Sequence, residues 1–422
     1  MPLSAEHIAA AQRAFALYQQ GRFQQALELA ETLLTLSPPQ PSLLNLAAVC
    51  ARPLGLTDKA ESYLRSAIGV KPDYAAAYGN LGLVLRDAGR LDEAEAAFQR
   101  ALELNPDDTD STINLGNLYR ATQRPAQAEA AFRKVLARAP ENVNALYNLG
   151  LLLSESDRAD EAEAAFRQSL KIRPDQADVY NDLGNVLMAR LRFDEAEQAY
   201  RQAIALWPGY ADAHCNLAIL LMDFRRMEEA WSLLQRCLHL QPDHANALNA
   251  MGNLLRQAGR LEEAEKAYRD ALKIRPDSAN FHGNLGNLLM ELNRPAEAEA
   301  GFRQAVALEP TYAYALGQAA SCARQLLAWS HAAADEASII SNIEQAAPGI
   351  PSRIIMFLPS AGAQLQLQAA LLASQNKIRP FLDKPPLFSP ATHPPGQRLR
   401  IGYLSADFRE HPVMHLLGGV FE

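Results

Sequence analysis

The sequence predicts an all-α protein in which repeated helix pairs stack into a right-handed superhelix. Three observations support this prediction. Proline recurs with a step of 34 residues, small and large apolar residues keep the same step, and the apolar residues inside each unit follow helical spacing. A unit of this length cannot bury its apolar face alone, so neighbouring units are expected to stack on one another.

The periodic prolines mark the end of each unit, because proline lacks the N–H group and disfavours a helical residue before it. They are Pro38, Pro72, Pro106, Pro140, Pro174, Pro208, Pro242, Pro276 and Pro310. Nine units are therefore predicted, beginning near His7 and ending at Pro310.

Small and large residues alternate between two predicted helices of each unit. The first helix carries a small residue, in most units glycine, and the second helix carries a large residue 16 positions later, as in Gly82 and Phe98 or Gly184 and Tyr200. The turn between the helices has Gly21, Gly55, Gly89 or Gly259, or a polar residue such as Asp157 or Asn293. This combination resembles the tetratricopeptide repeat, whose 34-residue unit is a helix, a turn and a second helix.

Two rows of polar side chains are predicted along the inner face of the superhelix. Because the step equals the repeat length, equivalent residues line up from unit to unit. The first row is Asn80, Asn114, Asn148, Asp182, Asn216 and Asn284, with Ala250 at the equivalent position of one unit. The second row, three residues further along the first helix, is Asn117, Asn185, Asn253 and Asn287.

We expect these amides to bind extended polypeptides, because an amide offers donors and an acceptor that match a peptide backbone. Concave solenoid surfaces are the usual binding faces, and asparagine is a mediocre helix former. The alternative is that these residues are solvated polar positions or local helix caps. A clamp for acidic C-termini is less favoured, since the inner positions are mostly asparagine rather than Lys or Arg.

Composition excludes several classes of function. The chain has 40 Lys and Arg against 48 Asp and Glu, so neither a nucleic-acid nor a membrane-surface partner is expected. Four scattered cysteines without a C-x-x-C pair predict no disulfide framework and no metal site. No leader or apolar membrane segment is recognisable, and a soluble, cytoplasmic protein is expected.

Beyond the repeats the composition changes. Residues 311–378 are expected to be a partial repeat and an irregular helical region, and residues 379–397 form a proline-rich connector. In residues 398–422, alternation in RLRIGYLS predicts a strand, ADFREHP a loop, and the residues after Pro412 a helix. Strand, loop and helix open many α/β domains.

The order of array, connector and the residues GYLSADFREHP, residues 402–412, resembles the protein O-linked N-acetylglucosamine transferases. The Spindly-like O-fucosyltransferases are close relatives of that family. The resemblance implies the truncated start of a metal-independent glycosyltransferase domain without a cofactor. It further implies UDP-GlcNAc as donor substrate, Ser and Thr of proteins as acceptors, and a catalytic role for His411.

We expect the 422-residue chain to be inactive alone, because the donor-binding lobe of such enzymes would follow residue 422. In that interpretation the superhelix binds acceptor proteins. The alternative is a non-catalytic scaffold for protein–protein interaction that uses the same groove.

Overall fold

The computed structural model describes residues 5–36, 40–327 and 330–345, together with residues 365, 368 and 372. These residues form helices and the turns between them, as the sequence predicts. Nine helix pairs follow one another from Ala5 to Leu308. The first helices of the pairs are α1 (Ala5–Gln19), α3 (Pro41–Ala51), α5 (Ala75–Asp87), α7 (Thr109–Ala121), α9 (Val143–Glu155), α11 (Ala177–Ala189), α13 (Ala211–Asp223), α15 (Ala245–Gln257) and α17 (Ala279–Glu291).

The second helices are α2 (Phe23–Leu36), α4 (Thr57–Val70), α6 (Leu91–Leu104), α8 (Pro125–Arg138), α10 (Ala159–Ile172), α12 (Phe193–Leu206), α14 (Met227–Leu240), α16 (Leu261–Ile274) and α18 (Pro295–Leu308). A short 3₁₀ helix, η1 (Arg52–Leu54), follows α3. Two further helices, α19 (Ala313–Gln325) and α20 (Ala332–Glu344), continue the array. The predicted strand, loop and helix at 398–422 and the connector at 379–397 lie outside the described residues.

The turn inside each pair requires a left-handed backbone conformation at one residue. Glycine supplies it at four turns, with φ between 72° and 74°. The other turns have φ between 56° and 60° at residues with side chains, including the predicted polar Asp157 and Asn293. They also include Leu191, where no small or polar residue signals the turn, and a Cβ in this conformation costs about 1–2 kcal/mol.

In six of the nine pairs, a glycine of the first helix packs against an aromatic ring of the second. A Cβ built on Gly150 would lie 2.5 Å from Cε1 of Phe166, and one on Gly184 would lie 2.5 Å from Cε1 of Tyr200. Both rings are fully buried. These glycines therefore let the two helices of a pair approach closely.

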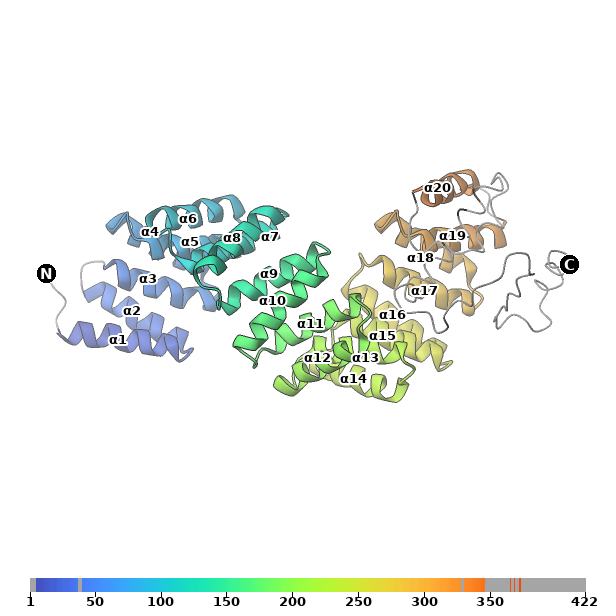
Figure 1. Cartoon of the computed structure of the whole chain (residues 1–422), viewed down its shortest axis with the longest axis horizontal. Coiled ribbons are helices and arrows are strands. Elements are labelled where there is room, and N and C mark those ends of the chain that lie inside the picture. Colours follow the sequence, from blue (N-terminus) through green and yellow to red (C-terminus); the bar gives the residue numbers. More distant parts are fainter. Residues whose placement is uncertain are drawn as a thin grey trace, which may run out of the picture.

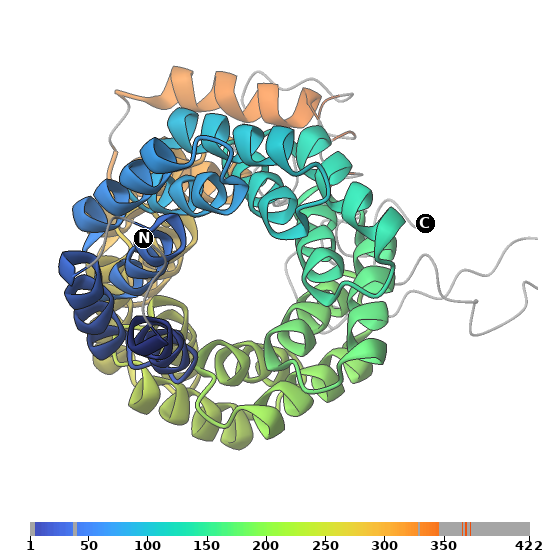
Figure 2. The same ribbon diagram turned by 90° about the vertical axis from the view of Figure 1, so that its left-hand side faces the viewer.

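The pairs wind into a superhelix with two layers (Figure 1). Each first helix contacts the first helix of the next pair, for example α11 with α13 and α13 with α15. The first helices therefore form the inner layer, and the second helices lie outside them around the same axis (Figure 2). The inner face is built from the first helices alone, which is where the two polar rows lie.

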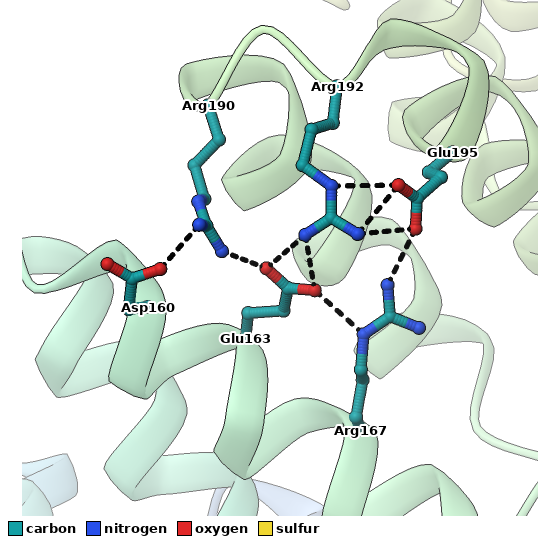
Figure 3. A network of polar contacts seen from close by, with 6 residues as sticks. All are labelled: Asp160, Glu163, Arg167, Arg190, Arg192 and Glu195. Atoms are coloured by element: carbon teal, nitrogen blue, oxygen red, sulfur yellow. Dashed lines mark hydrogen bonds and ion pairs between the residues drawn. The ribbon is translucent and has the colours of Figure 1, made fainter.

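A ladder of ion pairs joins successive pairs along the array. Before five of the second helices, α6, α10, α12, α14 and α18, an arginine contacts a glutamate in the first turn of the helix that follows it and a second glutamate from the preceding pair. Around Glu163 the network is densest, since its carboxylate receives bonds from Arg167 and Arg192 and contacts Arg190 (Figure 3). Arg192 also binds Glu195 of its own helix at 2.6 Å. These ion pairs are not predicted from the sequence.

Candidate functional site

The predicted inner rows lie on the first helices, each at the same place in its repeat. Their members are partly buried except Asn185, which is exposed. The leucine and glycine that follow a first-row residue, such as Leu149 and Gly150 after Asn148, are buried between the helices. The row residues therefore occupy the boundary between the packed layer and the inner surface.

First-row amides bond to the preceding repeat, a contact that the sequence analysis did not predict. Asn80 Nδ2 donates to Asn45 Oδ1 at 2.8 Å. Asn216 Nδ2 donates to Asn181 Oδ1 at 3.0 Å, and Asn284 donates in the same way to Asn249 at 3.0 Å. In each case the partner is 35 residues earlier, one residue before the equivalent position of the previous repeat. These amides join adjacent first helices as well as facing inward.

In other repeats, the first-row residue and the residue 35 positions before it are both of a different type. The Tyr147 hydroxyl donates to Asp182 Oδ2 at 2.9 Å, so in this pair the earlier residue is the donor and the first-row residue is the acceptor. Cys215 lies 35 residues before Ala250, at the corresponding partner position of the preceding repeat, and both side chains are apolar and buried. The Tyr147 hydroxyl therefore accounts for Asp182 in the row, and the exchange of the whole pair for apolar residues accounts for Ala250.

The second row serves partly to satisfy tyrosine hydroxyls. Tyr200 donates to Asn185 Oδ1 at 2.8 Å, and Tyr268 donates to Asn253 Oδ1 at 2.6 Å within the same repeat. Asn287 accepts from Tyr314 at 2.8 Å. A buried phenol needs such an acceptor. These three asparagines retain their Nδ2 donors for another partner.

A hollow of about 410 Å³ lies on the inner face where α5, α7 and α9 meet, and Asn80, Asn114 and Asn144 help to line it. The residue 35 positions before Asn114 is Gly79, which has no side chain to accept a bond, and within the described residues the Asn114 amide makes no side-chain hydrogen bond. On the same helix, Asn117 Oδ1 is buried and has no hydrogen-bond partner among the described residues. Asn148 donates to the Asn144 backbone oxygen at 2.8 Å, which leaves its own Oδ1 available. Unused amide groups of both rows thus lie next to this hollow.

An acidic group follows on the inner face of α11 and α13, consisting of Asp178, Asp182 and Asp212. Burial, together with repulsion from Asp178 and Asp212, raises the pKa of Asp182 despite the hydrogen bond from Tyr147. Burial and the same three carboxylates raise the pKa of Tyr210. The His244 Nε2 atom lies 2.9 Å from Asp212 Oδ1, while its Nδ1 accepts from the Ala247 N–H. This stretch of the inner face therefore carries a negative potential.

His411, the predicted catalytic residue, lies outside the described residues, so the structure does not place it. Among the described residues no group of His, Cys, Asp and Glu is arranged to hold a metal ion. Within the same part of the chain no helix has the length and apolar character to cross a membrane.

A superhelix of helix pairs with a polar concave face defines a helical-repeat protein. A family model described as the C-terminal domain of cilia and flagella-associated protein 70, a tetratricopeptide-repeat model, matches residues 107–326, just over half of the chain. Two models of the tetratricopeptide repeat itself match residues 75–108 and 11–69. The chain belongs to the tetratricopeptide-repeat family.

Solved structures with the same fold include the APC/C hetero-tetramer Cut9–Hcn1, with a TM-score of 0.51 and 15% identity over 88% of this chain and 84% of that one. A tetratricopeptide repeat protein from Parabacteroides merdae has a TM-score of 0.49 and 21% identity, covering 59% of this chain and 98% of its own. PilF of Pseudomonas aeruginosa has a TM-score of 0.46 and 21% identity, covering 51% and 97%. The first likeness shows the fold alone. No curated protein matches the chain at a significant level.

Proposed function

We propose that the inner face of the superhelix binds extended polypeptides, with a preference for basic segments. The observation that carries this proposal is an open hollow on the inner face that Asn114 helps to line, with the unused Oδ1 of Asn148 in the next repeat. An amide that lacks a partner gains a hydrogen bond when a peptide backbone reaches it. The neighbouring Asp178, Asp182 and Asp212 favour cationic side chains in the same polypeptide.

The test is fluorescence anisotropy with labelled peptides of equal length that are basic, neutral or acidic. We expect the basic peptide to bind most tightly and its affinity to fall with added salt, because exposed charges are screened. The combined substitution Asn114→Ala, Asn148→Ala and Asn216→Ala should weaken all peptides, whereas Asp178→Asn with Asp212→Asn should weaken only the basic one. Gln127→Ala with Gln168→Ala, on exposed positions of second helices, is the matched control.

Unchanged affinity in the triple asparagine variant would exclude the amide rows as the binding surface. Equal affinity for basic and acidic peptides would exclude the charge preference and leave backbone recognition in place. The two parts of the proposal are therefore tested separately.

A finer function is proposed from the residues GYLSADFREHP alone. In this proposal the superhelix presents acceptor proteins to a protein O-GlcNAc transferase, which transfers N-acetylglucosamine from UDP-GlcNAc to Ser and Thr hydroxyls, with His411 in its active site. Its support is the resemblance of residues 402–412, since the matched family models lie within residues 11–326.

The product of the complete reading frame should transfer labelled GlcNAc to protein acceptors, and His411→Ala should abolish transfer without reducing peptide binding. GDP-fucose in place of UDP-GlcNAc tests the Spindly-like alternative. Peptide binding without transfer from either donor would favour the non-catalytic scaffold.

A further inference from the structure

The first two repeats carry an apolar hollow on the inner face. It has a volume of about 530 Å³ and lies between α1 and α3, with Phe15, Tyr18, Leu46, Val49 and Tyr74 among its lining residues. The Phe15 side chain is 51% exposed, although it is aromatic and stands next to other apolar groups. None of the lining residues carries a formal charge at neutral pH. A hollow of this size and composition is suited to an apolar ligand group.

The hollow stands in register with the amide rows. Val49 precedes Asn117 by two repeats, so it occupies the second-row position, and Phe15 occupies that position one repeat earlier. Leu46 occupies the first-row position and precedes Asn80 by one repeat. A polypeptide that followed the amides from α9 toward α5 would therefore reach the hollow next. The inner face changes from amide to apolar chemistry at the same positions of the helices.

Burial of an aromatic or large aliphatic side chain is the strongest contribution that this hollow can make to binding. Apolar anchors in desolvated pockets dominate the affinity of many interfaces, whereas the polar contacts around them add specificity. Tyr74, which also lines the hollow, is half-buried. The occupant is therefore a single apolar side chain rather than a charged one.

We infer that the hollow lined by Phe15, Leu46 and Val49 holds an apolar anchor residue of the polypeptide that binds along the amide rows. This inference rests on the proposed function and specifies its ligand. The polypeptide is extended and basic, and it bears one aromatic or large aliphatic residue toward the end that lies on the first two repeats.

The experiment compares basic peptides of increasing length in which a single Phe is moved through each position. We expect Phe at one position, or at two adjacent ones, near one end to tighten binding about tenfold or more, as burial of one large apolar side chain predicts. The variant Leu46→Asn with Val49→Asn should lose this gain and still bind the peptide without Phe. It introduces the residues that Asn114 and Asn117 supply at the same positions two repeats later, where the fold accepts them.

The controls separate the hollow from the fold and from the rest of the groove. Leu206→Asn, at an exposed apolar position on the outer α12, should keep the full gain from Phe. If the double variant melts early by circular dichroism, Phe15→Ala replaces it, because the exposed Phe15 ring contributes little to the core.

Each outcome decides the inference. A gain from Phe that persists in the double variant places the anchor elsewhere and overturns it. Binding without any gain from Phe overturns the anchor and leaves the proposed function standing, whereas no binding of any peptide overturns both. A gain that appears only after deletion of residues 1–4, or self-association that the double variant abolishes in analytical ultracentrifugation, assigns the hollow to that segment or to a second copy.

Discussion

The Nδ2 atom of Asn216 lies 3.0 Å from Oδ1 of Asn181 in the preceding repeat and 3.2 Å from Oδ1 of Asn185. One amide thus joins α13 to α11 while it stands at the edge of the inner face. The amides of the two rows can stabilise the array and still bind a ligand, because an amide has more hydrogen-bonding groups than one contact uses. This division determines which substitutions should affect stability and which should affect binding.

Asn216→Ala should destabilise the protein more than Asn114→Ala. Removing Asn216 leaves the buried Asn181 without its donor, at a cost of about 1–3 kcal/mol, whereas the residue 35 positions before Asn114 is Gly79, which has no side chain to lose a bond. Urea unfolding followed by circular dichroism measures both. Equal midpoints for the two variants would contradict the pairing.

Gly150→Ala should destabilise the array, and Phe166→Leu in the same chain should restore part of the loss. The added Cβ would lie 2.5 Å from the buried Phe166 ring, and overpacking of this kind costs about 1–3 kcal/mol. The pair Ala218 and Leu234 already provides this combination in another repeat. A double variant less stable than both single variants in thermal unfolding would contradict the steric explanation.

Leu191→Gly should stabilise the protein by about 1 kcal/mol, since Leu191 has φ 59° and its side chain is exposed. Glycine adopts this conformation without a Cβ clash, although it also gains freedom in the unfolded chain. The control is Gly89→Leu, at the equivalent turn with φ 74°, which should destabilise. A lower melting temperature for Leu191→Gly would show that the leucine contributes packing that outweighs its backbone strain.

The helix pairs, their turns and the glycine-to-aromatic packing follow from the sequence, because the 34-residue step repeats the local pattern until chance is excluded. The pairing of Asn216 with Asn181 does not. To predict this pairing, one must know that a first-row residue contacts the residue 35 positions before it, one more than the repeat length. That offset is set by the geometry of the superhelix and not by the spacing of the repeats. A signal was present in the parallel changes from Asn181 and Asn216 to Cys215 and Ala250.

The ion-pair ladder does not follow from the sequence for a related reason. Arginine after the turn is visible in the sequence, but its second partner, such as Glu163 for Arg192, lies 29 residues earlier. A periodic polar residue on a helix usually indicates a solvated face, and only the packed superhelix brings the two together.

Acidification should weaken the array through Glu163. Burial alone would raise the pKa of Glu163, but hydrogen bonds from Arg167 and Arg192 outweigh it and hold this pKa below its usual range. A carboxylate whose pKa is lowered by folding contributes its full stabilisation at pH values above its unfolded pKa of about 4.3. This contribution to the free energy of unfolding is lost as the pH falls through the pKa of the folded state. The unfolding midpoint should therefore drop below about pH 4.3, and Glu163→Gln should reduce this dependence. Glu228→Gln, at an exposed carboxylate on α14, is the matched control variant.

Asp182→Asn should have the opposite pH behaviour and should separate stability from binding. Burial and the nearby Asp178 and Asp212 raise the pKa of Asp182, so its contribution to stability is favourable below the unfolded value of about 3.9 and is lost as pH rises through the folded value. Asparagine removes that penalty and keeps an acceptor for the Tyr147 hydroxyl. The variant should melt at a higher temperature at pH 7, and the gain should shrink near pH 3.

The same variant should bind basic peptides more weakly, because one carboxylate of the acidic group is gone. Asp178→Asn is the matched comparison, since Asp178 is exposed and should lose binding without a comparable gain in stability. Thermal unfolding at the two pH values and anisotropy with the basic peptide provide both readouts. Asp182 would then be a residue retained for the charge of the groove at the expense of the fold, whereas unchanged binding in both variants would show that the acidic group takes no part in recognition.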